Sequence, residues 1–197
     1  MKKLLLVLFF VPLISFGQTS AEYFNNGLEK MEKRDYKGAI TDYTKSIELD
    51  SNYADAYINR GIAKNKLRNH SGAIADFTKA IELEPNNTYP YITRGWSKNI
   101  LKDYYGAIVD FNKAIELDTN SSSAYYNRGD AKSKSEDYNG ALTDYTKAIE
   151  LDPDYAVAYR NRGVLKYFVG IDGCLDLMKA KELGGNVHPD AIKTICN

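Results

Sequence analysis

The stretch GAIADFTKAIELEPNN at residues 72–87 decides the fold, because the chain carries closely related versions of it that begin at Gly38, Gly106 and Gly140. These copies are spaced 34 residues apart. A tyrosine, followed four residues later by a glycine, recurs with the same period, as the pairs Tyr23 and Gly27, Tyr57 and Gly61, Tyr91 and Gly95, Tyr125 and Gly129, and Tyr159 and Gly163. Self-similarity at a fixed period predicts an array of like units.

The period and the order of these residues resemble the tetratricopeptide repeat, a helix-turn-helix unit of about 34 residues that ends in a proline. Pro85 and Pro153 occupy the closing position, whereas Ser51 and Thr119 depart from it. The resemblance covers nearly all of the chain after its first eighteen residues. It implies an all-α fold, a right-handed α-solenoid of five repeats with a short C-terminal capping helix.

The spacing of apolar residues supports two helices in each repeat. Apolar and small residues fall at helical spacing in 54–67 and again in 71–83, at Tyr57, Gly61, Ile74, Phe77 and Ala80. A lone helix pair cannot bury both of its apolar faces, so neighbouring pairs are expected to stack.

The predicted repeats are residues 20–53, 54–87, 88–121 and 122–155, followed by a fifth at 156–185. The fifth is two residues shorter between Gly163 and Asp172. The glycines at 184 and 185 then break the helix, and residues 186–197 are expected to form the capping helix, with Pro189 in its first turn.

Residues 1–18 have the pattern of a secretory signal peptide: a basic Lys2-Lys3 pair, an apolar run from Leu4 to Ile14, and small residues at Ser15 and Gly17. Cleavage is expected after Gly17 or Gln18. The alternative is a membrane anchor, but the apolar run is short for a span. The sequence therefore predicts an exported protein, periplasmic or secreted, with no membrane insertion after cleavage.

Composition limits the class of partner. The whole chain has 26 basic and 26 acidic side chains and no formal net charge, so it offers no basic surplus for nucleic acid or anionic lipid.

Both cysteines, Cys174 and Cys196, lie in the C-terminal unit. An exported chain meets oxidising conditions, which favour a disulfide between them over the alternative of two free buried thiols.

No sequence motif indicates catalysis, a cofactor or a metal. His70 and His188 are far apart and neither has another ligand at metal-site spacing. No nucleophile motif, phosphate-binding loop or acid-base pair is recognisable. We therefore expect a protein that is not an enzyme.

Charged residues recur with the period. Aspartates stand at Asp42, Asp76, Asp110 and Asp144, and arginines follow eighteen residues later at Arg60, Arg94, Arg128 and Arg162. The first repeat has Asn26 in the arginine position. Because that repeat has no predecessor, the pattern predicts that each aspartate pairs with the arginine of the next repeat and fixes the stacking register. Pairing within a repeat is the alternative. In both cases the residues are interpreted as structural.

The family resemblance places the first helix of each repeat on a concave groove, with one ladder position per repeat: Asn25, Asn59, Thr93, Asn127 and Asn161. A row of amides can hold an extended peptide backbone, since each offers donors and an acceptor. The ladder is similar to the one that holds peptide in O-linked N-acetylglucosamine transferase. Alternatively, these residues only keep the groove soluble or bond to the adjacent helix.

Apolar residues line the same groove, and among them Tyr126 and Trp96, the only tryptophan, are candidate contacts. Trp96 is the candidate anchor, although an aromatic residue at helical spacing can equally belong to the core. The carboxylate clamp of chaperone-binding members is absent. The predicted function is a non-catalytic scaffold that binds an extended peptide or partner protein in its groove. The alternative is an assembly component that associates through its ends or convex face, including self-association.

Overall fold

A computed structural model describes residues 18–196, and within this range the secondary structure is helical with no strand. The helices are α1 (Ser20–Glu32), α2 (Tyr36–Leu49), α3 (Ala54–Lys66), α4 (His70–Leu83), α5 (Thr88–Ile100), α6 (Tyr104–Leu117), α7 (Ser122–Lys134), α8 (Tyr138–Leu151), α9 (Ala156–Phe168), α10 (Cys174–Glu182) and α11 (Pro189–Ile195). The predicted all-α solenoid of five helix pairs with a short C-terminal helix is confirmed.

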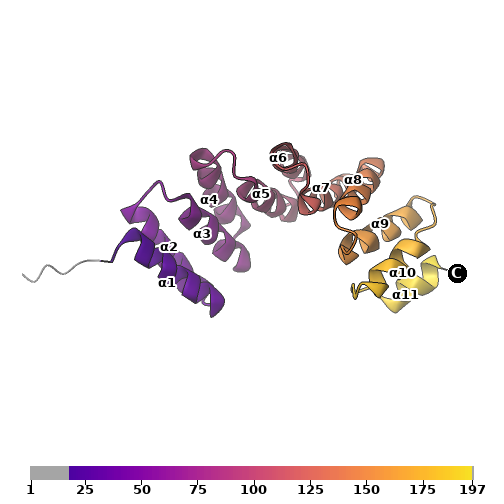
Figure 1. Ribbon diagram of the computed structural model, residues 1–197, viewed down its shortest axis with the longest axis horizontal. Coiled ribbons are helices and arrows are strands. Elements are labelled where there is room, and N and C mark those ends of the chain that lie inside the picture. The colour runs from indigo at the N-terminus through magenta and orange to yellow at the C-terminus, as the bar shows by residue number, and fades with distance from the viewer. Residues whose placement is uncertain (1–17, 197) are drawn as a thin grey trace, which may run out of the picture.

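The helix pairs follow an arch in Figure 1, with α6 near its top. Each helix from α2 to α9 packs against the helices before and after it in the chain. The odd-numbered helices from α1 to α7 also contact one another in succession, whereas the even-numbered helices of residues 18–196 make at most marginal contact with each other. The array therefore curves toward its odd helices, which form the concave surface.

The glycine of the repeated Gly-Ala-[Ile/Leu] triplet lies in the first turn of each even helix from α2 to α8. In α6 the side chain of Asp103 accepts a hydrogen bond from the backbone N–H of Gly106 at 3.0 Å, which caps the helix N-terminus. A Cβ at Gly106 would collide with that carboxylate. Glycine at this position therefore leaves room for the capping carboxylate, which a Cβ would displace.

The second recurring glycine lets the two helices of a repeat approach closely. A Cβ at Gly95 on α5 would lie 2.8 Å from the ring of Phe111 on α6, which is fully buried. The same contact recurs between Gly27 and Tyr43, Gly61 and Phe77, and Gly129 and Tyr145. This contact fixes which residues face each other across a repeat, and it positions the charged residues described below.

The C-terminal unit is attached differently from the rest. A disulfide joins Cys174 at the start of α10 to Cys196 just after α11, with a Cα–Cα distance of 4.9 Å. None of the residues of α11 is buried. The short helix is thus tethered by a covalent bond more than by a packed core.

None of the helices within residues 18–196 is long and apolar enough to cross a membrane. The predicted signal peptide spans residues 1–18. Residues 1–17 lie outside the described range, which begins at Gln18.

Candidate binding groove on the concave face

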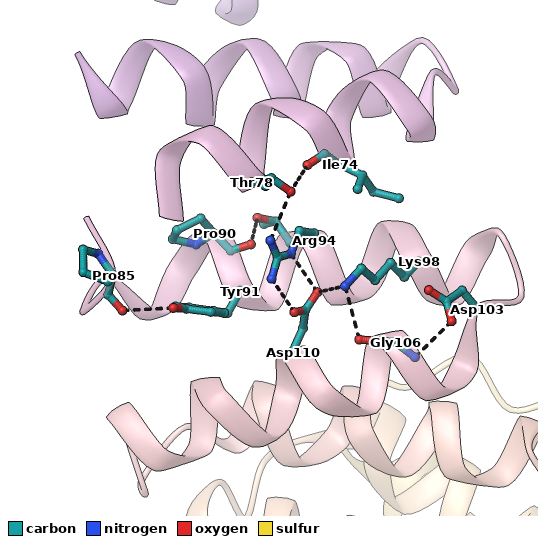
Figure 2. Close-up of polar contacts among 11 residues, drawn as sticks. Ile74, Thr78, Pro85, Pro90, Tyr91, Arg94, Lys98, Asp103, Gly106 and Asp110 are labelled. Atoms are coloured by element: carbon teal, nitrogen blue, oxygen red, sulfur yellow. Dashed lines mark hydrogen bonds and ion pairs between the residues drawn. The ribbon is translucent and has the colours of Figure 1, made fainter. Parts of the chain in front are cut away.

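The recurring arginines and aspartates pair within one repeat. Arg94 on α5 donates from Nε to Asp110 Oδ2 at 3.0 Å and from Nη2 to Oδ1 at 2.7 Å, as Figure 2 shows. The predicted pairing across repeats, Asp76 with Arg94, is therefore wrong. The contact of Gly95 with Phe111 explains the pairing. Arg94 precedes Gly95 and Asp110 precedes Phe111, so this contact places the two charged side chains opposite each other. The same within-repeat pairs form at Arg60 and Asp76, Arg128 and Asp144, and Arg162 and Asp176.

A lysine completes each carboxylate site. Lys98 Nζ lies 2.8 Å from Asp110 Oδ2, and the equivalent pairs are Lys30 with Asp42, Lys64 with Asp76, Lys132 with Asp144 and Lys166 with Asp176. Burial alone would raise the pKa of Asp176, but hydrogen bonds from Arg162 and Lys166 outweigh it and hold the pKa below its usual value. The periodic lysine four residues after each arginine was a visible signal that sequence reasoning did not use.

The arginines nevertheless connect neighbouring repeats through a different partner. Arg94 Nη1 donates to Thr78 Oγ1 on α4 at 3.1 Å, and Thr78 in turn donates to the Ile74 carbonyl at 2.8 Å. Thr44, Asn112 and Thr146 accept from the next repeat's arginine in the same way. One guanidinium thus links both helices of its own repeat to the repeat before it. Figure 2 shows this network between the helices that it joins.

The first repeat lacks this link. Asn26 occupies the arginine position, and Asp42 is held by Lys30, whose Nζ lies 2.6 Å from Oδ2, as an ion pair without a directed hydrogen bond. All five aspartates are buried. Their position favours the structural interpretation over contact with a ligand.

The predicted ladder is not uniform. Asn59 Nδ2 donates to the Asp55 carbonyl at 2.9 Å, and Asn127 Nδ2 donates to the Ser123 carbonyl at 2.7 Å, so both amides bond to their own helix. Thr93 does likewise with Tyr89, and Asn25 is exposed.

At the last position of the ladder, Asn161 uses both the nitrogen and the oxygen of its side-chain amide in hydrogen bonds within the protein. Its Nδ2 donates to the Tyr126 hydroxyl at 3.1 Å, and its Oδ1 accepts from Arg160 Nε at 3.2 Å. Tyr126 itself packs against Tyr145 and Tyr155, and burial raises the pKa of its phenol. Tyr126 and Asn161 therefore belong partly to the packing between repeats.

Trp96 lies at the surface. It is 39% exposed, and its ring meets that of His70 edge to face at a centroid distance of 5.6 Å. Other apolar residues that the sequence placed on the odd helices pack in the core instead. Ile58 on α3 is buried, and Phe24 on α1 packs between Tyr43 and Tyr53. The accessible apolar surface is therefore smaller than the sequence pattern suggests.

Two pockets are lined by exposed apolar side chains of the odd helices. The first, about 370 Å³, lies between repeats 2 and 3 and is lined by Asn65, Lys66, Arg68, His70, Trp96 and Ile100. The second, about 400 Å³, lies between repeats 4 and 5 and is lined by Asp130, Ser133, Lys134, Tyr138, Tyr145, Asn161, Val164, Leu165 and Phe168. Below they are called the Trp96 pocket and the Phe168 pocket.

The two pockets are the same site, two repeats apart. Adding 68 to the Trp96-pocket positions 65, 66, 70, 96 and 100 gives positions 133, 134, 138, 164 and 168, all of which line the Phe168 pocket. At the intervening position, between repeats 3 and 4, Asn99 Nδ2 donates to Asp130 Oδ2 at 2.7 Å, and Lys134 pairs with the same carboxylate oxygen. The equivalent position between the two pockets is thus polar, and Asp130 and Lys134 also form one wall of the Phe168 pocket.

No group of three or more potential metal ligands is found among residues 18–196. His70 Nδ1 lies 3.0 Å from Asn65 Oδ1, and His188 accepts from the backbone of Asp190. Each histidine has a local hydrogen-bond partner.

Comparison with known families agrees with this geometry. A family model described as TPR repeat matches residues 27–67 and 129–170, and one described as tetratricopeptide repeat matches 54–87. Together they cover more than half of the chain. The chain is a tetratricopeptide repeat protein. A comparison with curated proteins found no match.

Solved repeat proteins share the fold. The chain resembles MamA from Desulfovibrio magneticus RS-1 with a TM-score of 0.79 and 20% identity, over 85% of this chain and 96% of that one. YrrB, described as a TPR protein with an unusual peptide-binding site, gives 0.69 and 24%, over 83% and 86%. PilW, a widely conserved type IV pilus biogenesis factor, gives 0.78 and 19%, over 88% and 81%. At these identities the likeness concerns the fold.

Proposed function

We propose that this repeat protein is a non-catalytic scaffold that binds an extended polypeptide along the concave surface of repeats 2 to 5. The observation that carries the proposal is the pair of equivalent pockets around Trp96 and Phe168, which are lined chiefly by residues of the odd helices. Exposed aromatic side chains in a concave site, together with polar side chains that can orient a ligand, are usual features of a binding site.

The odd helices also carry polar groups that suit a peptide backbone. The amides of Asn59 and Asn127 donate to their own helices, so their carboxamide oxygens remain available to accept from backbone N–H groups. Main-chain bonds of this kind add affinity without requiring a particular side chain. The description of YrrB as a peptide-binding repeat protein supports the same role by analogy.

The N-terminal end of the array is poorly suited to the alternative, association through its ends. On α1, Glu22 and Glu29 are exposed at the positions where α3 buries Ala56 and Ala63. Together with Asn26 in the arginine position, they give the first repeat a polar outer face. Another repeat stacked there would bury two carboxylates.

The C-terminal end has lost two of the contacts that a following repeat would use. Met178 stands at the position where Thr146 accepts from the next arginine, and Lys181 replaces the buried Ile149. This end nevertheless exposes Leu175 and Met178, at 81% and 50%, so the polar N-terminal end is what favours the groove over the ends. Association through the convex face is a second candidate, because Tyr105 and Val109 on α6 are 78% and 64% exposed.

Replacing Asn59 and Asn127 together with alanine is expected to weaken peptide binding by about 1 to 3 kcal/mol, because backbone donors of the peptide lose their acceptors. Calorimetry with the tightest peptide from a random 12-residue library measures this. Asn52→Ala with Asn139→Ala, two exposed asparagines outside the groove, is the matched control. Equal affinity of both double variants and the wild type would remove the ladder from the mechanism.

We further propose export with removal of residues 1–17 or 1–18. Cleavage there leaves the first helix intact, since Thr19 caps α1 by accepting from the Glu22 N–H while Glu22 accepts from the Thr19 N–H. N-terminal sequencing of the protein from an extracytoplasmic fraction is expected to begin at Gln18 or Thr19. Recovery of the chain from the cytoplasm with Met1 in place would contradict export.

A further inference from the structure

We propose that the groove recognises a specific peptide pattern: an aromatic residue beside an acidic one, and a second large apolar residue about six positions away. The spacing follows from the distance between the pockets, which lie two repeats apart. The acidic and aromatic pair occupies the Trp96 pocket, and the second apolar residue occupies the Phe168 pocket. This inference rests on the proposed function and adds the class of ligand and its direction in the groove.

The apolar part of the pattern follows from the exposed side chains of the two pockets. Trp96 and Ile100 are 39% and 44% exposed in the first pocket, and Val164 and Phe168 are 45% and 67% exposed in the second. The Phe168 ring is held edge to face against Tyr138 at a centroid distance of 5.2 Å. Aromatic side chains of a ligand can stack on these rings, and such anchors contribute most of the affinity in interfaces.

The charge of the two pockets differs. Lys66 and Arg68 line the Trp96 pocket, both are exposed, and neither forms an ion pair with another residue in the 18–196 range. In the Phe168 pocket, Lys134 is neutralised by Asp130 at 2.7 Å, and the counterpart of Arg68 is Glu136. A carboxylate on the ligand is therefore attracted to one end only, which sets the direction of the peptide.

The spacing follows from helix packing. The odd helices from α1 to α7 contact one another in succession, and packed helices lie about 10 Å apart, so two repeats separate the pockets by about 20 Å. An extended chain advances about 3.3 to 3.6 Å per residue, so about six residues cover that distance. Before it reaches the Phe168 pocket, this segment passes the ion pair of Asp130 with Lys134, where small polar residues of the ligand fit.

Trp96 reports directly on the test, since it is the only tryptophan in the chain. Synthetic Ser/Gly peptides are titrated into the protein while Trp96 emission is followed. The peptides carry two phenylalanines three, six or nine positions apart, with Asp, Ser or Lys beside one of them. Both orders of the charged residue along the peptide are included. The six-residue spacing with Asp is expected to bind at least tenfold more tightly than the three-residue spacing, which is too short to fill both anchor pockets. With Lys in place of Asp, affinity falls about five- to tenfold.

Charge reversal in the protein tests the acidic preference without disturbing the fold. Lys66→Glu with Arg68→Glu introduces residues that other repeats already carry at these positions, Glu32 and Glu136, the latter also with a positive φ of 69°. This variant is expected to prefer the Lys peptide over the Asp peptide. The control is Lys102→Glu, at the same turn position one repeat later and outside both pockets.

Phe168→Lys, which copies Lys134 of the preceding repeat, tests the second anchor. It is expected to remove the dependence on spacing and to lower affinity for the six-residue peptide about thirtyfold. Two-phenylalanine peptides that bind equally at every spacing and with either charge, yet lose affinity in Phe168→Lys, would overturn this inference and leave the proposed groove standing. Binding that neither Phe168→Lys nor the asparagine variant weakens would overturn both.

Discussion

Arg94→Ala is expected to lower the free energy of unfolding of the central repeats by about 3 to 5 kcal/mol, because it leaves a buried carboxylate without its main partner. Asp110 is 2% exposed and takes two hydrogen bonds from Arg94. Lys98 alone remains after the change, as Lys30 does for Asp42 in the first repeat. The bond from Arg94 to Thr78 on α4 is lost as well, so the contact between repeats 2 and 3 weakens.

Urea unfolding followed by circular dichroism, together with hydrogen exchange resolved along the chain, measures this effect. Lys113→Ala removes an exposed ion pair with Glu116 in the same repeat and is expected to cost at most about 1 kcal/mol. Arg94→Ala with Asp110→Ala is expected to recover part of the loss, since no buried charge then remains. A loss for Arg94→Ala no larger than for Lys113→Ala would show that the network contributes little to stability.

The fold could be predicted from the sequence because one local pattern is written four times and is followed by a shortened fifth version. Each of the four full copies contains the cap, the small residue at the helix contact and the buried aromatic residue, whereas the fifth has Leu177 in the aromatic position and no side-chain cap. The arginine pairing could not be predicted from period alone: Arg94 is eighteen residues after Asp76 and sixteen before Asp110, and a periodic list does not distinguish the two. The contact of Gly95 with Phe111 decides between them, and it depends on how the helices pack.

The candidate site was predictable only in part. The sequence pointed to the odd helices and to Trp96, but it could not separate the exposed Trp96 from the buried Ile58, since burial depends on how closely neighbouring repeats approach. The basic residues of the Trp96 pocket were missed for a similar reason. Arg68 lies in a turn with a positive φ of 62°, and the fold brings it to the pocket although it is outside every helix.

Reduction of the Cys174–Cys196 disulfide is expected to release α11 and destabilise the C-terminal unit by about 3 kcal/mol, as the chain-entropy model gives for a closed loop of this size. The bond closes a loop with a sequence separation of 22. Since α11 buries none of its residues, packing alone holds it weakly once the bond is broken. The effect should stay local, because the stability of a repeat array is a sum over neighbouring units.

Hydrogen exchange with and without reductant tests this, and Cys174→Ser with Cys196→Ser tests it without reductant. Amides of α11 and the end of α10 are expected to exchange about a hundredfold faster once the bond is absent, the factor that corresponds to about 3 kcal/mol. Amides of α5 and α6 serve as the internal control and should be unchanged. If α11 exchanged at the same rate in the oxidised and reduced protein, the tether would have no role in holding it. If α5 and α6 also lost protection, the array would unfold as one unit, and the C-terminal disulfide would stabilise all of it.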